Sequence, residues 1–170
     1  MVWKVKLSTV KRIFCTYLVN HIYVGTRCFD QKRRILNCIG YEIGEGTKVV
    51  GPIYNTGKLK VGKDCWIGKN MTVNGNGTVV IGDNCDIAPE VTFLTGGHKI
   101  GNSSRRAGDG EIYAIEVGSG TWIGARSTIG GNTNIGKGCM IAACACVMNN
   151  IEDNRLVGGV PAKEIRVLDD

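Results

Sequence analysis

The feature that most constrains this chain is a six-residue repeat, in which a branched aliphatic residue is followed by a small one. The longest run starts at Val117 and contains six consecutive units: VGSGTW, IGARST, IGGNTN, IGKGCM, IAACAC and VMNNIE. Shorter runs start at Val61 and, after a two-residue slip, at Ile81, and a fainter one starts at Ile43. This period fits neither a helix of 3.6 residues per turn nor an alternating strand. It indicates short strands joined by turns, with the aliphatic side chains pointing inward.

Three such sides close a triangular coil of about 18 residues, and stacked coils bury a continuous aliphatic column. Residues 43–152 then predict about five to six coils and a height of about 25 Å. The 25 glycines beside only three prolines fit a chain that turns often. We therefore expect an all-β parallel β-helix over residues 41–155, with a basic helical segment (1–40), one excursion loop (99–115) and a C-terminal cap (156–170).

The repeat also explains most of the cysteines. The position four residues after each aliphatic residue favours a small inward side chain, and it holds Cys65, Cys85, Thr121, Ser127, Thr133 and Cys139. We interpret these thiols as core filling. The eight cysteines include no C-x-x-C pair, and the N-terminus lacks the pattern of a secretory signal peptide. We therefore expect reduced thiols in a cytoplasmic protein.

One stretch, FLTGGHKIGNSSRRAGDGEIYAIEVG, interrupts the repeat between Phe93 and Gly118 and holds His98, one of only two histidines. A neutral imidazole can remove a proton from a weakly acidic hydroxyl group as that group attacks a thioester, and can return the proton to the leaving thiolate. We therefore predict that His98 is a general base. For His21, which falls in a probable helix, we predict a structural role.

The segments VTFLTGGH, VGSGTWIGARSTIGGNTNIGKGCMIAACACV and LVGGVPAKEIR resemble the sugar O-acetyltransferases of the hexapeptide-repeat acyltransferase family. These include the maltose and galactoside acetyltransferases and relatives that act on capsular or exopolysaccharide sugars. The resemblance implies a left-handed β-helix, although right-handed crossovers are the general rule. It also implies a homotrimer with active sites between subunits. The activity that the resemblance implies is acetyl transfer from acetyl-CoA to a hydroxyl group, with His98 at the position of the family's single catalytic histidine.

The acceptor site is the less defined half of this comparison. In the sugar acetyltransferases an asparagine one coil before the histidine contacts the acceptor. Asn74 matches it better than Asn76, although either asparagine would also suit a turn. The loop residues Arg105 and Arg106 would bind an acidic sugar or a phosphate, or else would be solvated surface charge. Residues 1–40 do not resemble the acceptor-binding segment of the maltose-type enzymes.

For acetyl-CoA the resemblance assigns a row of residues towards the C-terminus. Trp122 matches the tryptophan beside the pantetheine arm, and Ala125 and Ala143 match positions whose backbone groups bond its amides. Lys163 and Arg166 match the basic residues that meet the nucleotide phosphates, where cations are expected. We expect no metal and no nucleic-acid partner.

Basic charge is concentrated in the N-terminal segment. Residues 1–40 hold eight Lys or Arg against one acid, a balance of +7, whereas residues 41–170 hold 13 basic and 14 acidic residues. Apolar or aromatic residues recur there near helical spacing: Leu7, Val10, Phe14, Tyr17, Leu18, His21 and Ile22. Such a helix would pack on the β-helix or across a subunit boundary. Alternatively it would lie on an anionic membrane surface, with Arg33 and Arg34 strengthening the contact.

The leading functional hypothesis is O-acetylation of a sugar during surface polysaccharide synthesis. An antibiotic, an amino acid such as serine, or an amino sugar remain alternative acceptors, and a non-catalytic assembly protein remains an alternative class. The β-helix carbonic anhydrases hold zinc through three histidines, and this chain has only two. That activity is therefore excluded.

Overall fold

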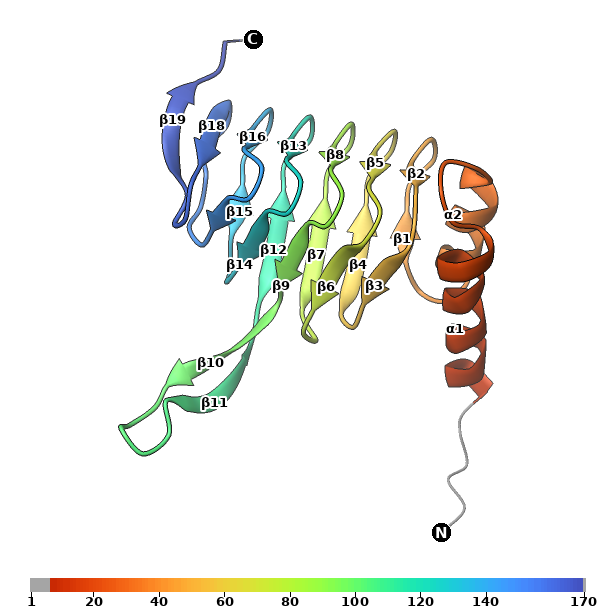
Figure 1. Ribbon diagram of the computed structural model, residues 1–170, viewed down its shortest axis with the longest axis horizontal. Coiled ribbons are helices and arrows are strands. Elements are labelled where there is room, and N and C mark those ends of the chain that lie inside the picture. The colour runs from red at the N-terminus through yellow and green to blue at the C-terminus, as the bar shows by residue number, and fades with distance from the viewer. Residues whose placement is uncertain (1–6, 170) are drawn as a thin grey trace.

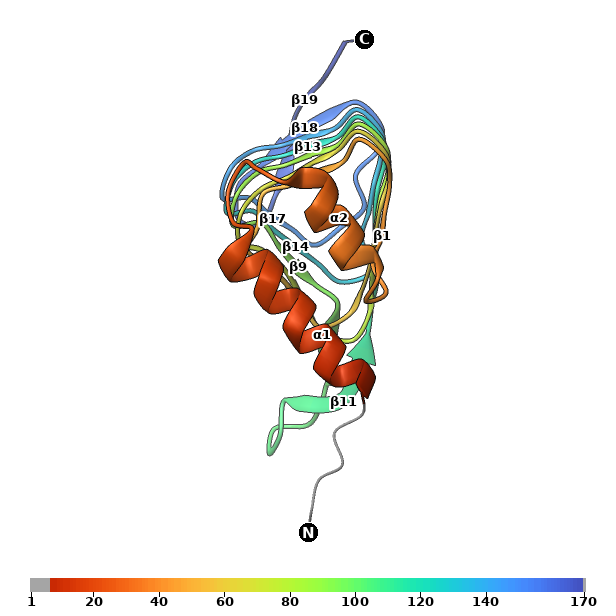
Figure 2. The ribbon, with the colours of Figure 1, turned by 90° about the vertical axis from the view of Figure 1, so that its right-hand side faces the viewer.

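The computed structural model describes residues 7–169, which form a left-handed parallel β-helix closed at one end by helices (Figure 1). Each coil contributes one short strand to each of three parallel sheets. Viewed along the axis, the coils superimpose on a triangular outline (Figure 2). The predicted fold is confirmed, and about six coils are present.

Within each sheet, neighbouring strands come from successive coils. The first sheet contains β1 (Glu42–Ile43), β4 (Lys58–Val61), β7 (Thr78–Ile81), β12 (Ala114–Val117) and β15 (Asn134–Ile135). The second contains β2 (Lys48–Val49), β5 (Trp66–Ile67), β8 (Asp86–Ile87), β13 (Trp122–Ile123), β16 (Met140–Ile141), β18 (Arg155–Gly158) and β19 (Lys163–Val167). The third contains β3 (Ile53–Asn55), β6 (Met71–Asn74), β9 (Thr92–Leu94), β14 (Thr128–Gly130) and β17 (Cys146–Val147).

The core is a set of aliphatic columns that run along the axis. In the second sheet, Ile67 pairs with Ile87, Ile87 with Ile123, and Ile123 with Ile141, and all four side chains are buried. Because parallel strands are in register, each layer places the same kind of side chain above the last. The inward position of the sequence repeat therefore becomes a continuous dry interior.

The small-residue position of the repeat has a second role beyond filling space. Its side chain donates a hydrogen bond to a backbone carbonyl group of the next coil: Thr121 Oγ1 to Gly136 (2.9 Å), Ser127 Oγ to Ala142 (2.9 Å) and Cys65 Sγ to Gly82 (3.1 Å). Ser, Thr and Cys all carry a donor of this reach, which explains why they interchange there.

Two helices cover the N-terminal end of the β-helix: α1 (Leu7–Tyr17), which continues as a short π-helix (Leu18–Ile22), and α2 (Phe29–Asn37). From α2, Leu36 and Lys32 are fully buried against the first coil. Lys32 Nζ donates to the carbonyl groups of Gly25 (2.6 Å) and Val50 (3.0 Å), and burial lowers the pKa of this amine. Asn20 donates to the carbonyl oxygen of Ile53 and accepts from its N–H group, so that it satisfies the free edge of β3.

The N-terminal helical segment packs on the β-helix, one of the two arrangements expected for it, but not through its apolar face. Phe14 and Tyr17 are exposed, whereas Cys15 and Val19, on the other side of the helical segment, are buried. The physical reason is that α2 already closes the core. What remains for α1 is the polar edge of β3, where Arg12 Nη2 donates to the carbonyl oxygen of Asn55 at 3.2 Å.

The excursion from the coil is an ordered β-hairpin, not an irregular loop (Figure 1). Strands β10 (Gly96–Ile100) and β11 (Ala107–Ile112) pair antiparallel and project from the middle of the solenoid. Pairing satisfies backbone groups that the coils no longer reach. The chain leaves the solenoid at Gly96, earlier than expected, so His98 lies within the hairpin itself. At the C-terminal end, β18 and β19 form a second antiparallel pair.

Candidate active site

His98 is held on β10 with one ring nitrogen bonded and the other free. It pairs with Gly110 across the hairpin, and its Nδ1 atom lies 2.9 Å from the carbonyl oxygen of Gly108. A carbonyl oxygen only accepts, so Nδ1 must carry the proton in the neutral ring. The lone pair is then on Nε2, which forms no hydrogen bond or ion pair among the described residues. The arrangement fixes the tautomer that a general base requires.

On the opposite face of the hairpin, Tyr113 bonds to Glu111 and packs against Gly97. We call this contact the brace; the sequence did not reveal it. Tyr113 Oη donates to Glu111 Oε2 at 2.9 Å, and this bond raises the pKa of the phenol. Glu111 pairs with Gly97, and a Cβ atom added to Gly97 would lie 2.6 Å from Tyr113 Oη. The aromatic ring therefore occupies the space that the glycine leaves, directly beside His98 in the chain. Two sequence features could have indicated this contact: the glycine pair before His98, and Tyr113, where the chain returns to the solenoid.

The coil below the hairpin presents the predicted acceptor asparagines at its base. Asn74 pairs with Leu94, and its carbonyl oxygen accepts from Thr95 N at 2.7 Å. The next residue, Gly75, approaches the start of the hairpin so closely that a Cβ atom there would lie 2.6 Å from Gly96 N. Both Asn74 and Asn76 are exposed at this corner. The structure thus brings the corner they occupy to the base of the strand that carries His98.

Arg105 and Arg106 lie elsewhere, at the far tip of the hairpin. Gly101 N donates to the carbonyl oxygen of Arg106, and Arg106 Nη1 donates back to the carbonyl oxygen of Gly101 at 3.1 Å. Both arginines are exposed. No hydrogen bond between described residues joins either arginine to His98, although the His98 ring bonds to the carbonyl oxygen of Gly108, whose N–H group donates to the carbonyl oxygen of Arg106 at 3.1 Å.

Trp122, assigned to the coenzyme, stands half-exposed on the outer face of the second sheet. It pairs with Asp86, which also pairs with Trp66, so the two tryptophans flank one residue of β8. Together with Ala88 and Pro89 they line a surface hollow of about 450 Å³. Asp86 also lines this hollow, so it combines aromatic faces, which suit an extended aliphatic chain, with one carboxylate.

Ala125 and Ala143 occupy one corner of the helix, one coil apart. The carbonyl oxygen of Ala125 accepts from Cys144 N at 2.9 Å. Within residues 7–169, no carbonyl group accepts from the N–H group of Ala125 or of Ala143. These two N–H groups are therefore available to a ligand that lies along the corner.

Lys163 and Arg166 lie on β19 at the C-terminal end. Both are exposed, and neither takes part in an ion pair among the described residues. The neighbouring acid, Glu164, is instead bonded to Arg155 at 3.1 Å. The two cations are therefore free to meet an anion such as a phosphate group.

The model of the family described as "Bacterial transferase hexapeptide (six repeats)" matches residues 114–149. The galactoside O-acetyltransferase of Escherichia coli K12 is 32% identical over 156 residues, which cover 91% of this chain and 76% of that protein. The chain belongs to the hexapeptide-repeat acyltransferases. Serine acetyltransferase 2 of Arabidopsis thaliana is 28% identical over 159 residues, covering 84% of the acyltransferase and 48% of the relative.

Solved structures agree with this assignment. A galactoside acetyltransferase in complex with coenzyme A superimposes with a TM-score of 0.80 at 25% identity. The alignment covers all of this chain and 86% of that chain. The Vibrio cholerae acetyltransferase VCA0836, complexed with acetyl coenzyme A, has a TM-score of 0.81 at 22% identity and covers 96% of this chain and 88% of its own. At that identity the second structure supports the fold alone.

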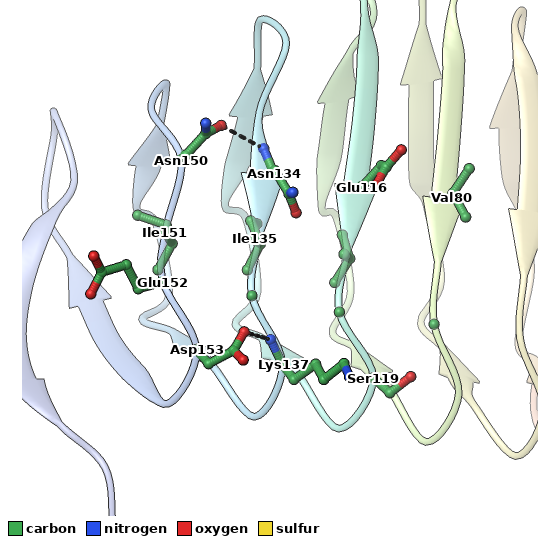
Figure 3. Close-up of a pocket in the computed structure, with 14 residues that line it drawn as sticks. Val80, Glu116, Ser119, Asn134, Ile135, Lys137, Asn150, Ile151, Glu152 and Asp153 are labelled. Atoms are coloured by element: carbon green, nitrogen blue, oxygen red, sulfur yellow. Dashed lines mark hydrogen bonds between the residues drawn. The ribbon is translucent and has the colours of Figure 1, made fainter.

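A surface hollow of about 650 Å³ lies away from the residues described above (Figure 3). It follows the outer face of the first sheet, and its polar side chains serve the fold. Asn150 Oδ1 accepts from Asn134 N at 2.8 Å, and Asp153 Oδ1 accepts from Lys137 N at 2.7 Å (Figure 3). These bonds join successive coils. The described part of the chain also contains no group of three His, Cys, Asp or Glu side chains arranged to hold a metal ion.

Proposed function

We propose that this acyltransferase moves the acetyl group of acetyl-CoA to a hydroxyl group of a sugar during surface polysaccharide synthesis. It would work as a homotrimer in the cytoplasm, with the basic N-terminal segment near the inner membrane face. One observation carries the proposal. The Gly108 carbonyl group accepts the Nδ1–H proton of His98, so Nε2 is left free to accept a proton. The hairpin that carries His98 leaves the solenoid next to Asn74. The identity to galactoside O-acetyltransferase supports the sugar as acceptor.

In the proposed reaction Nε2 of His98 accepts the hydroxyl proton while the acceptor oxygen attacks the thioester carbonyl carbon. The new C–O bond gives a tetrahedral intermediate, and its collapse breaks the C–S bond. The protonated Nε2 then returns its proton to the departing thiolate. The Gly108 carbonyl oxygen stabilises the positive charge on the ring between these two steps. General-base assistance of this kind contributes about 10²–10⁴-fold to the rate.

The coenzyme residues form a continuous row in this proposal. Trp122 would pack along the pantetheine arm, the free N–H groups of Ala125 and Ala143 would bond its amides, and Lys163 and Arg166 would meet the phosphates. Two of the similar structures are complexes with coenzyme A or acetyl coenzyme A, in agreement with this reading.

The projecting hairpin supports the proposed homotrimer. Arg105 and Arg106 lie at its tip, where they would meet a neighbouring subunit. Asn74 and Asn76 would then contact the acceptor from the hairpin base, while the two arginines would favour an acidic or phosphorylated sugar.

A second candidate acceptor is the hydroxyl group of serine, since a serine acetyltransferase matches 84% of the chain. The shared chemistry predicts the same base for both acceptors. A transfer screen that includes sugars, nucleotide sugars and serine separates them.

The test of the proposal compares His98→Ala with His21→Ala, because the chain has only these two histidines. His21 stacks on Tyr17 with ring centroids 4.6 Å apart, remote from the hairpin. We expect the first change to lower the transfer rate about 10²–10⁴-fold and the second to leave it unchanged. Absence of acetyl-CoA binding by calorimetry, or a wild-type rate in His98→Ala, would contradict the proposal. A monomer by light scattering would contradict the shared site.

A further inference from the structure

Helix α1 carries an apolar face that its own chain leaves uncovered. We name this face the outer stripe; it consists of Leu7, Val10, Ile13, Phe14 and Tyr17, which are 85%, 50%, 64%, 61% and 54% exposed. Cys15 and, beyond the helix, Val19 form the opposite, buried side. An amphipathic helix normally turns its apolar face to the protein, and here the orientation is reversed.

The position of α1 places the outer stripe at one end of the solenoid. Both views show α1 lying across that end, outside the first coil (Figures 1 and 2). The hairpin leaves the solenoid further along and leans away from α1 (Figure 1). The stripe therefore faces outward from a terminal surface that no other described element covers.

Positive charge surrounds this surface. Lys11, Arg27 and Arg34 are exposed on or next to the two helices. Asp30 is the only acid in residues 7–40, and it is already bonded to Arg33 at 3.2 Å. The terminal surface thus combines an apolar stripe with uncompensated basic side chains.

We propose that the outer stripe binds the surface of an anionic lipid bilayer, with α1 lying in the plane of the interface. The apolar and aromatic side chains would enter the boundary between headgroups and acyl chains, and the basic residues would meet anionic headgroups. A second copy that meets the same face about a two-fold axis is the less favourable occupant, because Lys11 and its basic neighbours would lie against the same residues of the other copy. The contacts of the proposed homotrimer are heterologous and escape this argument, and light scattering of the stripe variants tests them.

The mode of attachment is peripheral, because no helix within residues 7–169 is long and apolar enough to cross a bilayer. The proposal goes beyond the acyl-transfer chemistry and does not depend on it. Transfer to a soluble acceptor, measured in parallel, therefore distinguishes failure of lipid binding from failure of the proposed function.

The experiment is flotation of the full chain with vesicles of phosphatidylcholine alone or with about a third phosphatidylglycerol. We expect binding to the anionic vesicles only, and release in about 1 M NaCl, where the Debye length falls to about 3 Å. Phe14→Ser and Tyr17→Ser should each weaken binding about tenfold. Ile165→Ser is the matched control, because Ile165 is 60% exposed on β19 at the other end of the solenoid.

Light scattering of the same variants completes the test. We expect every variant to keep the mass of the wild type. The proposal is overturned if the wild type does not bind anionic vesicles, or if the stripe variants bind as it does. It is also overturned if Phe14→Ser lowers the oligomer mass, because that result means a second copy covers the stripe.

Discussion

Replacing Gly97 by alanine tests whether the brace beneath the hairpin positions His98, the proposed general base. The added Cβ atom would lie 2.6 Å from Oη, 2.9 Å from Cε2 and 3.1 Å from Cζ of Tyr113. An ordinary contact begins at 3.4 Å, so the ring and the strand together must yield by about 0.8 Å, and the bond of Tyr113 Oη to Glu111 at 2.9 Å opposes movement of the ring alone. His98 is the next residue along β10, and it moves with the strand.

The size of the effect follows from this displacement. Overpacking of a core costs about 1–3 kcal/mol of stability, and the part-exposed Tyr113 ring places this change at the lower end, about 1 kcal/mol. For a chain of this length that corresponds to a lower melting temperature by about 2–4 °C. A misplacement of about 1 Å at a reacting group lowers the rate about 10²-fold. We therefore expect Gly97→Ala to lower kcat for acetyl transfer about 10²-fold and to leave the KM for acetyl-CoA close to the wild-type value.

The neighbouring glycine provides the control. A Cβ atom on Gly96 would lie 3.4 Å from Gly75 Cα and 3.7 Å from the carbonyl oxygen of Glu111, which are ordinary contacts. Gly96→Ala should keep the wild-type kcat and melting temperature. Adding Tyr113→Phe to Gly97→Ala removes the closest contact and should restore part of the rate. If Gly97→Ala has the kcat of Gly96→Ala, then the brace does not position His98 and the reasoning is refuted.

Three further outcomes are expected. Ile123→Ala removes a fully buried side chain between two coils and should lower the free energy of unfolding in a denaturant titration by about 2–5 kcal/mol. Trp122→Ala should raise the KM for acetyl-CoA about tenfold with a smaller change in kcat, because it removes ground-state packing; an unchanged KM would count against the coenzyme row. Glu90 bonds to Arg126 at 2.6 Å, and this hydrogen bond lowers the pKa of the carboxyl group. The bond stabilises the folded state at pH values above the pKa that Glu90 has in the unfolded chain, and this stabilisation is lost as the pH falls through the lower pKa of the folded state. Glu90→Gln should therefore be less stable than wild type at pH 7 and equally stable at about pH 2.

The coil architecture was predictable because its information is local. Each unit carries its own inward aliphatic residue and its own turn, and parallel stacking repeats the same environment in every layer. The columns through Ile67 and Ile123 and the position held by Cys65 and Thr121 follow from the period alone. The reason why Ser, Thr and Cys share that position became clear only from the hydrogen bond between coils.

The candidate site was predictable in part. The break in the repeat led to the prediction of His98 as the base, since a long excursion is rare in so regular a chain. The group that orients it could not be found from sequence, because the Gly108 oxygen is a backbone atom that reaches the ring only when β10 and β11 pair. The packing of Tyr113 over Gly97 joins residues on opposite strands, and the register of pairing decides which residues meet.

The sequence by itself determined that this chain winds into a β-helix and that one histidine stands where the winding stops. Only the tertiary structure decided which way the N-terminal helix faces. Helical spacing defines an apolar face but not its direction, and that direction depended on competition for the end of the solenoid. Leu36 of α2 fills the open end of the core, and Asn20 bonds the edge of β3. As a result Phe14 and its apolar neighbours were left facing outward.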